Sequence, residues 1–185
     1  MARVTYLTPE TAPPAVASTL AKMPQLHVFQ MVAHAETAFR PWLKFGGAVL
    51  ADLAIDPLLR ELVILQVGRL AARYEWEQHV PIALAAGGTT EQVEALDRGE
   101  LGTFDPSTRA ALEFTAALVR DGEVSDENYA ALAGEFSERE IVEIALTAAH
   151  YLGLARIMTA LRIDPDAPAG PEGLPAARVE RPSAG

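Results

Sequence analysis

Cysteine is absent from this chain of 185 residues. Its absence excludes disulfides, thiolate metal ligands and cysteine nucleophiles. This composition is compatible with the reducing cytoplasm, which is the location we expect. Positive charge is also scarce, because 15 Lys and Arg face 25 Asp and Glu and give a formal net charge of −10. A charge of this sign argues against a nucleic acid as the partner.

Long apolar runs and strand patterns are missing as well. No uncharged apolar run reaches the roughly 18 residues that cross a bilayer, so we expect no membrane partner. The first ten residues, MARVTYLTPE, have no apolar stretch of the signal-peptide kind. No segment alternates apolar and polar residues as a strand does. The four histidines show no zinc-site spacing, so we expect neither a metal nor another cofactor.

Apolar residues instead recur at helical spacing, so the predicted fold class is all-α, with about seven to nine helices and no sheet. Helices are predicted over 15–23, 26–35, 40–53, two within 56–87, and then 89–97, 106–121, 125–134 and 139–161. Residues 1–163 should form one domain. The Pro-rich residues 164–185 are interpreted as an extended or disordered tail that could lie on a neighbouring subunit.

Two details of the predicted helix over 40–53 concern its backbone. Pro41 fits the first turn of a helix, where its missing N–H has no cost. Gly46 and Gly47 weaken helix propensity in the middle of the segment. Their presence suggests that another backbone or a ligand approaches closely at this point.

The stretch from Asp56 to Gly87 contains most of the chemically usable side chains. It reads as two helices with a tight connection near 71–74, the first opened by Asp56 as N-cap and the second closed by Gly87. On the second helix Glu75 and His79 are four residues apart and share a face. A carboxylate beside an imidazole suits general acid–base chemistry. Whether Glu61, on the first helix, meets His79 depends on how the helices cross or on a second subunit.

Three segments resemble the carboxymuconolactone decarboxylase family, which includes the alkylhydroperoxidase D-like proteins. They are Arg60-Glu61-Leu62, the run YEWEQHVPIA from Tyr74 to Ala83, and FRPWLKFG from Phe39 to Gly46. The resemblance extends from about Leu26 to Leu161. It implies an alkylhydroperoxidase D-like helical bundle that assembles into homotrimers or hexamers.

The chain departs from the redox branch of that family, which carries a Cys-x-x-Cys pair before its histidine. Counting back from His79, the two cysteine positions hold Ala72 and Glu75. Thiol peroxidase and disulfide chemistry require a thiolate. The resemblance therefore favours the cysteine-independent branch.

Two classes of function are open at this stage. The first is a decarboxylase-like lyase acting on a small carboxylated lactone or a related acid. Its candidate catalytic residues are His79, Glu61, Glu75 and Tyr74, and its candidate substrate-binding residues are Trp76, Arg69, Arg40, Arg156 and His150. The second is a family member without catalysis that binds a small molecule or serves oligomer assembly. In that case the same residues would be ordinary packing, ion-pair and surface groups.

The missing thiol gives a first testable prediction. The pure protein should not reduce organic hydroperoxides with a dithiol as electron donor, because no residue can form the sulfenic acid of a cysteine. The measurement is dithiol-dependent consumption of an organic hydroperoxide. A robust rate above that of heat-denatured protein would contradict the prediction.

Overall fold

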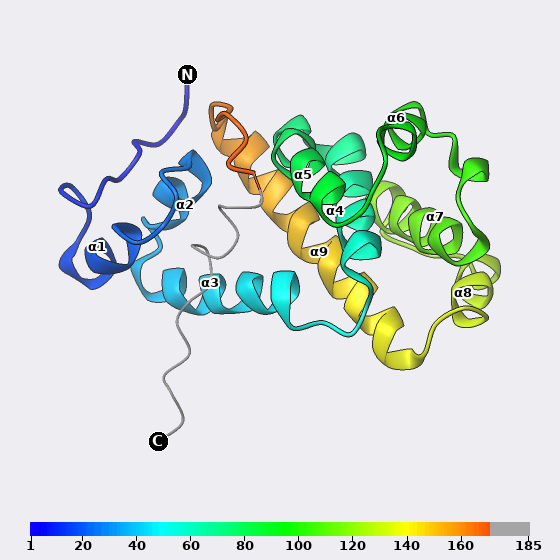
Figure 1. Cartoon of the computed structure of the whole chain (residues 1–185). Helices are drawn as coiled ribbons and strands as arrows, with labels where there is room; N and C mark the ends of the chain where they lie inside the picture. Colours follow the sequence, from blue (N-terminus) through cyan, green and yellow to red (C-terminus); the bar gives the residue numbers. More distant parts are fainter. Residues whose placement is uncertain (171–185) are drawn as a thin grey trace.

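The computed structural model describes residues 1–170, which form nine α-helices, one short 3₁₀ helix and no strand (Figure 1). The prediction of an all-α fold is confirmed. The elements are α1 (Pro14–Leu20), α2 (His27–Val32), α3 (Glu36–Ala51), α4 (Pro57–Ala71), α5 (Arg73–Ala85), α6 (Thr90–Arg98), η1 (Leu101–Thr103), α7 (Pro106–Asp121), α8 (Asp126–Ala133) and α9 (Glu138–Leu161).

Side-chain caps start five of the described helices, and the cap of α4 is the predicted Asp56. The Asp56 carboxylate accepts hydrogen bonds from the N–H groups of Leu58 and Leu59, at 2.9 and 3.1 Å. Thr89 and Ser137 each form a full capping box at the start of α6 and α9. Asp105 caps α7. Each cap satisfies backbone donors that the first turn leaves without a partner.

The N-terminal boundary of α3 differs from the prediction. The helix begins at Glu36 rather than at residue 40, so Pro41 lies inside it and not in its first turn. The preceding residues of the helix, from Glu36 to Phe39, contain no residue that breaks a helix. The loss of one backbone hydrogen bond at Pro41 therefore does not stop the helix.

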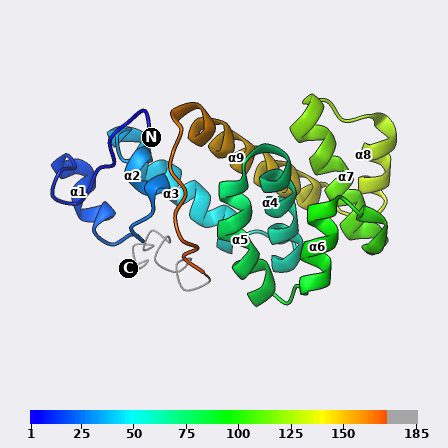
Figure 2. The same cartoon turned by 90° about the horizontal axis from the view of Figure 1, so that it is seen from above.

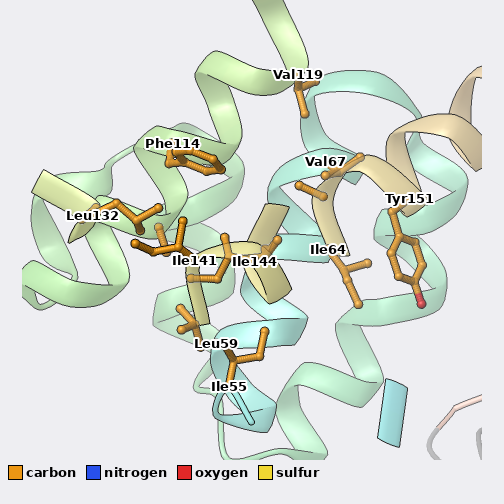
Figure 3. Packing of buried hydrophobic residues seen from close by; sticks show 14 of the residues in the cluster. Ile55, Leu59, Ile64, Val67, Phe114, Val119, Leu132, Ile141, Ile144 and Tyr151 are labelled. Carbon is orange, nitrogen blue, oxygen red and sulfur yellow. The ribbon is translucent and has the colours of Figure 1, made fainter. Parts of the chain in front are cut away.

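Helix α4 is the centre of the bundle and packs against α5, α7 and α9. All ten residues from Leu59 to Gly68 are buried, including the polar Arg60, Glu61 and Gln66. Figure 3 shows Ile64 and Val67 of α4 among side chains from α7, α8 and α9 in the largest apolar cluster. A helix enclosed on every side brings its polar residues into the interior, where each needs a partner.

Helices α4 and α5 approach each other very closely. Only Ala72 separates them, and it is extended, with φ −162° and ψ 121°. A Cβ atom added to Gly68 would lie 2.6 Å from the backbone nitrogen of Trp76, so no larger residue fits there without movement. This contact brings the buried middle of α4 against the face of α5 that carries His79.

Helix α9 is the only helix of residues 1–170 with the length and composition to cross a membrane. Half of its apolar stretch is buried within the protein, where it contacts α3, α4, α5, α7 and α8. A helix in the middle of a packed core has the same composition. On its outer face Val142, Leu146 and Ile157 remain 56, 43 and 48% exposed.

After α9 the chain turns back and runs in extended form between α2 and α5 (Figure 2). Within the predicted tail, residues 164–170 therefore lie on their own chain. The remainder, 171–185, is outside the described residues.

Candidate active site

A cavity of about 110 Å³ lies between the N-terminal helices and the α5–α9 side of the bundle. Its walls come from α2, α3, α5 and α9 and from the segment 169–170. Its described lining is mostly apolar and aromatic and contains no Lys, Arg or Asp. The polar side chains in it are Tyr74, Glu75, Gln78, His79, His150 and Tyr151.

The carboxylate of Glu61 lies beneath this cavity and joins Arg60 to His79. It is completely buried. Its Oε1 accepts from Arg60 Nε and Nη2 at 2.9 and 2.8 Å, and its Oε2 lies 2.7 Å from His79 Nδ1. The contact is made within one chain, which settles the geometry that the sequence left open. Burial alone would raise the pKa of Glu61, but His79 and Arg60 hold that pKa below its ordinary value.

These contacts assign the proton on the imidazole. A carboxylate can only accept, so Nδ1 of His79 carries a hydrogen. In the neutral ring Nε2 is then the basic nitrogen, and no described residue forms a hydrogen bond with it. His79 lines the cavity. The arrangement is that of a base held in a single tautomer by a buried carboxylate.

Glu75 has a different environment from Glu61. Its side chain is 2% exposed and lines the cavity, and its Oε1 has no hydrogen-bond partner. Burial raises the pKa of Glu75 to about 7, although the nearby His79 opposes the rise. The sequence suggested that Glu61 or Glu75 orients His79. The structure shows the hydrogen bond from Glu61 only and leaves Glu75 free to face a bound molecule.

Aromatic rings from α3 and α9 form another wall of the cavity. Tyr151 packs edge-on against His79, with ring centroids 4.9 Å apart and an interplanar angle of 86°. His150 contacts Trp42, Phe45 and Tyr151. Burial lowers the pKa of His150 to about 4, so this ring is neutral at pH 7.

The sequence suggested that another backbone or a ligand approaches the Gly46–Gly47 pair, and the structure places a side chain against Gly46 instead. A Cβ atom at Gly46 would lie 3.3 Å from His150 Nε2. A larger residue at this position would therefore press on the ring of His150. The approaching group is a side chain of α9, and both glycines also line the cavity.

Tyr74 and Gln78 connect the cavity to the segment after α9. The Tyr74 hydroxyl donates to Asp166 Oδ2 at 2.6 Å. Burial and the neighbouring Asp166 raise the pKa of Tyr74, so this phenol keeps its proton. Gln78 Nε2 donates to the carbonyl oxygens of Asp166 and Ala167, both at 3.2 Å.

Four of the candidate substrate-binding residues lie away from the cavity lining. Trp76 is buried in the apolar cluster of α4, α5 and α6. Arg69 donates to Gln66, and Arg40 donates to Thr19. Arg156 is on the exposed side of α9. No arginine therefore faces the described cavity to hold a substrate carboxylate.

The sequence interpretation assigned no role to Arg60, Gln78, Tyr151 or Asp166. Arg60 directly precedes Glu61 on a mostly apolar helix, and adjacent opposite charges in such a place signal a buried pair. Tyr151 directly follows the candidate residue His150, and this position could have identified it as a further candidate. Asp166 is distant in sequence from every contact it makes, and its Pro-rich surroundings gave no signal.

A sequence model of the carboxymuconolactone decarboxylase family matches residues 36–117, from α3 into α7. This range contains Arg60, Glu61, Glu75 and His79. Residues 36–117 of this chain thus match the carboxymuconolactone decarboxylase family. The resemblance inferred from the sequence is confirmed, over a shorter range than the 26–161 expected. The comparison with curated proteins gives no match.

Several solved structures share the fold of this chain. An alkylhydroperoxidase AhpD core protein from Ralstonia eutropha JMP134, described as an uncharacterized peroxidase-related protein, has 17% identity and a TM-score of 0.74, covering 97% of this chain and 98% of that one. A peroxidase-related protein from Silicibacter sp. TM1040 has 19% identity, 76% coverage of both chains and a TM-score of 0.69. A cysteine-to-alanine variant of the debrominase Bmp8, in complex with 2,3,4-tribromopyrrole, has 21% identity, 94% coverage of both chains and a TM-score of 0.76.

The raised pKa of Glu75 predicts a pH dependence of stability. The folded protein holds this proton more tightly than the unfolded chain, so the stabilisation is present below the unfolded pKa and is lost as pH rises through about 7. Between pH 5 and pH 8 the Glu75→Gln variant should gain stability relative to wild type. The gain should be on the order of 3 kcal/mol, since one pKa unit corresponds to about 1.36 kcal/mol.

Chemical denaturation at several pH values measures this difference. Glu77→Gln is the matched control, because Glu77 lies on the same helix but is exposed. A constant difference between Glu75→Gln and wild type across this pH range would contradict the assignment.

Proposed function

We propose that this protein is a cysteine-independent enzyme that transfers a proton to or from a small molecule bound in the cavity. The observation that carries the proposal is the buried Arg60–Glu61–His79 chain, which ends at the cavity. His79 Nε2 would accept or return the proton. Glu61 would orient the ring and stabilise its charged form, as Arg60 keeps Glu61 ionised.

The position of His79 favours catalysis over a packing role. A histidine used only for packing would be enclosed by protein, whereas this ring lines a cavity. Ionised groups are costly to bury, and Arg60 and Glu61 are buried beneath that ring. The free-energy cost of burying these two charges has a functional reason if Arg60 and Glu61 hold His79 in one tautomer.

Lyase chemistry on a carboxylated lactone, the reaction expected from the resemblance, has less support. Such a substrate needs a cation for its carboxylate, and the described cavity lining contains none. An uncharged carbon acid or a ring with a weakly acidic proton suits this cavity better. The complex of Bmp8 with a small pyrrole supports small-molecule binding by the shared fold and does not specify the reaction here.

Exchange of carbon-bound hydrogen in D₂O, followed by NMR over a panel of small lactones, ketones and phenols, tests for proton transfer. His79→Gln should slow enzyme-dependent exchange by ~100-fold or more, the usual contribution of general acid–base catalysis. Glu61→Gln should cause a smaller loss, because it removes the orienting charge and keeps the base. Glu77→Gln, on the exposed side of α5, should match wild type.

Undiminished exchange in a folded His79→Gln variant would remove His79 from the mechanism. A change in melting temperature or assembly with activity retained would instead indicate a packing role for the histidine.

We also propose that the protein is a homo-oligomer, a trimer or hexamer as the family resemblance implies. The exposed side chains of Val142, Leu146 and Ile157 on α9 form an apolar face that a second copy would cover. Light scattering at micromolar concentration should report a mass above that of one chain. Leu146→Glu should lower that mass, and a monomeric wild type would refute the proposal.

A further inference from the structure

The polar groups that face the cavity define what kind of molecule it can hold. Glu75 Oε1 is buried without a hydrogen-bond partner, which costs free energy unless a ligand supplies one. His79 offers Nε2 as an acceptor because Nδ1 is bound to Glu61. Glu75 and His79 are four residues apart on α5, so both groups lie on one side of the cavity.

The charges around the cavity disfavour an anion. Among the described lining residues there is no Lys or Arg, and the nearby Arg60 is already bound to Glu61. Glu75 becomes negative as the pH rises past its pKa of about 7. A carboxylate placed in this cavity would lose its water without gaining a cation.

The size and walls of the cavity favour one planar ring. Its volume is about 110 Å³. A dry apolar cavity of about 150 Å³ in another protein holds benzene, so a single ring is the right scale. The rings of Trp42, His150 and Tyr151 offer faces and edges for aromatic contacts.

We propose that the cavity binds a small uncharged planar ring with one weakly acidic O–H or N–H group, such as a phenol or an azole. That group faces Glu75 and His79, and the rest of the ring contacts the apolar and aromatic wall. The proposal rests on the proposed function in that it takes the same cavity as the substrate site.

Binding of p-cresol, toluene and p-toluate tests this ligand class, because the three share a ring and differ in one substituent. Calorimetry with wild type should show p-cresol binding at least 10-fold tighter than toluene, and p-toluate not binding. In Glu75→Leu the advantage of p-cresol over toluene should shrink, while Glu77→Gln should keep it. Equal affinity for p-cresol and toluene in wild type, or tightest binding of p-toluate, would overturn the proposal.

The wild-type comparison decides the question even if Glu75→Leu fails to fold. Failure of this proposal is also distinguishable from failure of the proposed function. Ring binding with no effect of His79→Gln on proton exchange would remove only the catalytic role. Exchange that depends on His79, in a protein that binds none of the rings, would remove only the ligand class.

A second observation concerns residues 164–170, the segment that follows α9. Asp166 connects this segment to two helices at the edge of the cavity. Its Oδ2 accepts from the Tyr74 hydroxyl at 2.6 Å and from the backbone N–H of His27 at 2.8 Å. Its Oδ1 lies 2.8 Å from His27 Nδ1. Gln78 adds hydrogen bonds to the backbone of Asp166, Ala167 and Ala169.

The same segment closes one side of the cavity, since Ala169 and Gly170 are among the lining residues. No residue of 164–170 takes part in the four apolar clusters of the protein. The segment is therefore held mainly by polar contacts near the surface. Segments held in this way open at a lower free-energy cost than packed helices do.

We infer that residues 164–170 form a gate over the cavity and that Asp166 is the residue that holds it closed. Ligands enter when Asp166 leaves Tyr74 and His27. Asp166→Ala should then lift the protection of this segment against hydrogen exchange, including the amide of Ala169, which donates to Gln78.

Hydrogen exchange of the full chain, with acrylamide quenching of Trp42 in a Trp76→Phe background, tests the gate. Asp166→Ala should increase both exchange of 164–170 and quenching of Trp42 several-fold. Asp97→Ala, which breaks the surface ion pair with Arg73, should change neither. Unchanged exchange in Asp166→Ala, or faster exchange without added quenching, would overturn the gate. If Asp166→Ala does not fold, Tyr74→Phe removes one of the same contacts and should shift both readouts in the same direction.

Discussion

The carboxylate of Glu61, buried between Arg60 and His79, is the contact on which the rest of the site depends. An isolated carboxylate could not remain ionised at zero exposure, so both of its oxygens need strong partners. The fold supplies them by enclosing α4 on all sides and by packing α5 against it at Gly68. The result is an imidazole whose basic nitrogen is left for a ligand.

The carboxyl groups of Glu61 on α4 and Glu75 on α5 differ in pKa because their surroundings differ. Glu61 has an arginine and a histidine as partners, and its pKa is held low. Glu75 is buried and its Oε1 has no hydrogen-bond partner. Burial raises its pKa to about 7. Glu75 also occupies a position where the redox branch of the family carries a cysteine. In place of a thiol, the cavity thus presents a carboxyl group whose pKa is close to neutral pH.

Helix positions were predictable because caps and periodicity are local. Asp56 starts α4 as expected, and the start of α3 differs because a proline inside a helix can be tolerated. The family resemblance was also readable from the sequence.

The partners of each site residue were not readable in the same way. Which carboxylate contacts His79 depends on how closely α4 and α5 pack at Gly68. Such a packing contact leaves no periodic pattern in the sequence. The arginines seemed suitable for a substrate carboxylate, but Arg40 and Arg69 bond to neighbouring polar side chains elsewhere. Asp166 reaches Tyr74 across 92 positions, and contacts at that separation follow from the tertiary fold alone.

The role of the Glu61–His79 contact can be tested through the tautomer of His79. Nitrogen-15 NMR of histidine-labelled protein, at a pH where the ring is neutral, distinguishes a protonated from an unprotonated ring nitrogen. We predict a hydrogen on Nδ1, bound to Glu61, and an unprotonated Nε2 that faces the cavity. A neutral His79 with its hydrogen on Nε2 would exclude this role, because the cavity would then have no oriented base.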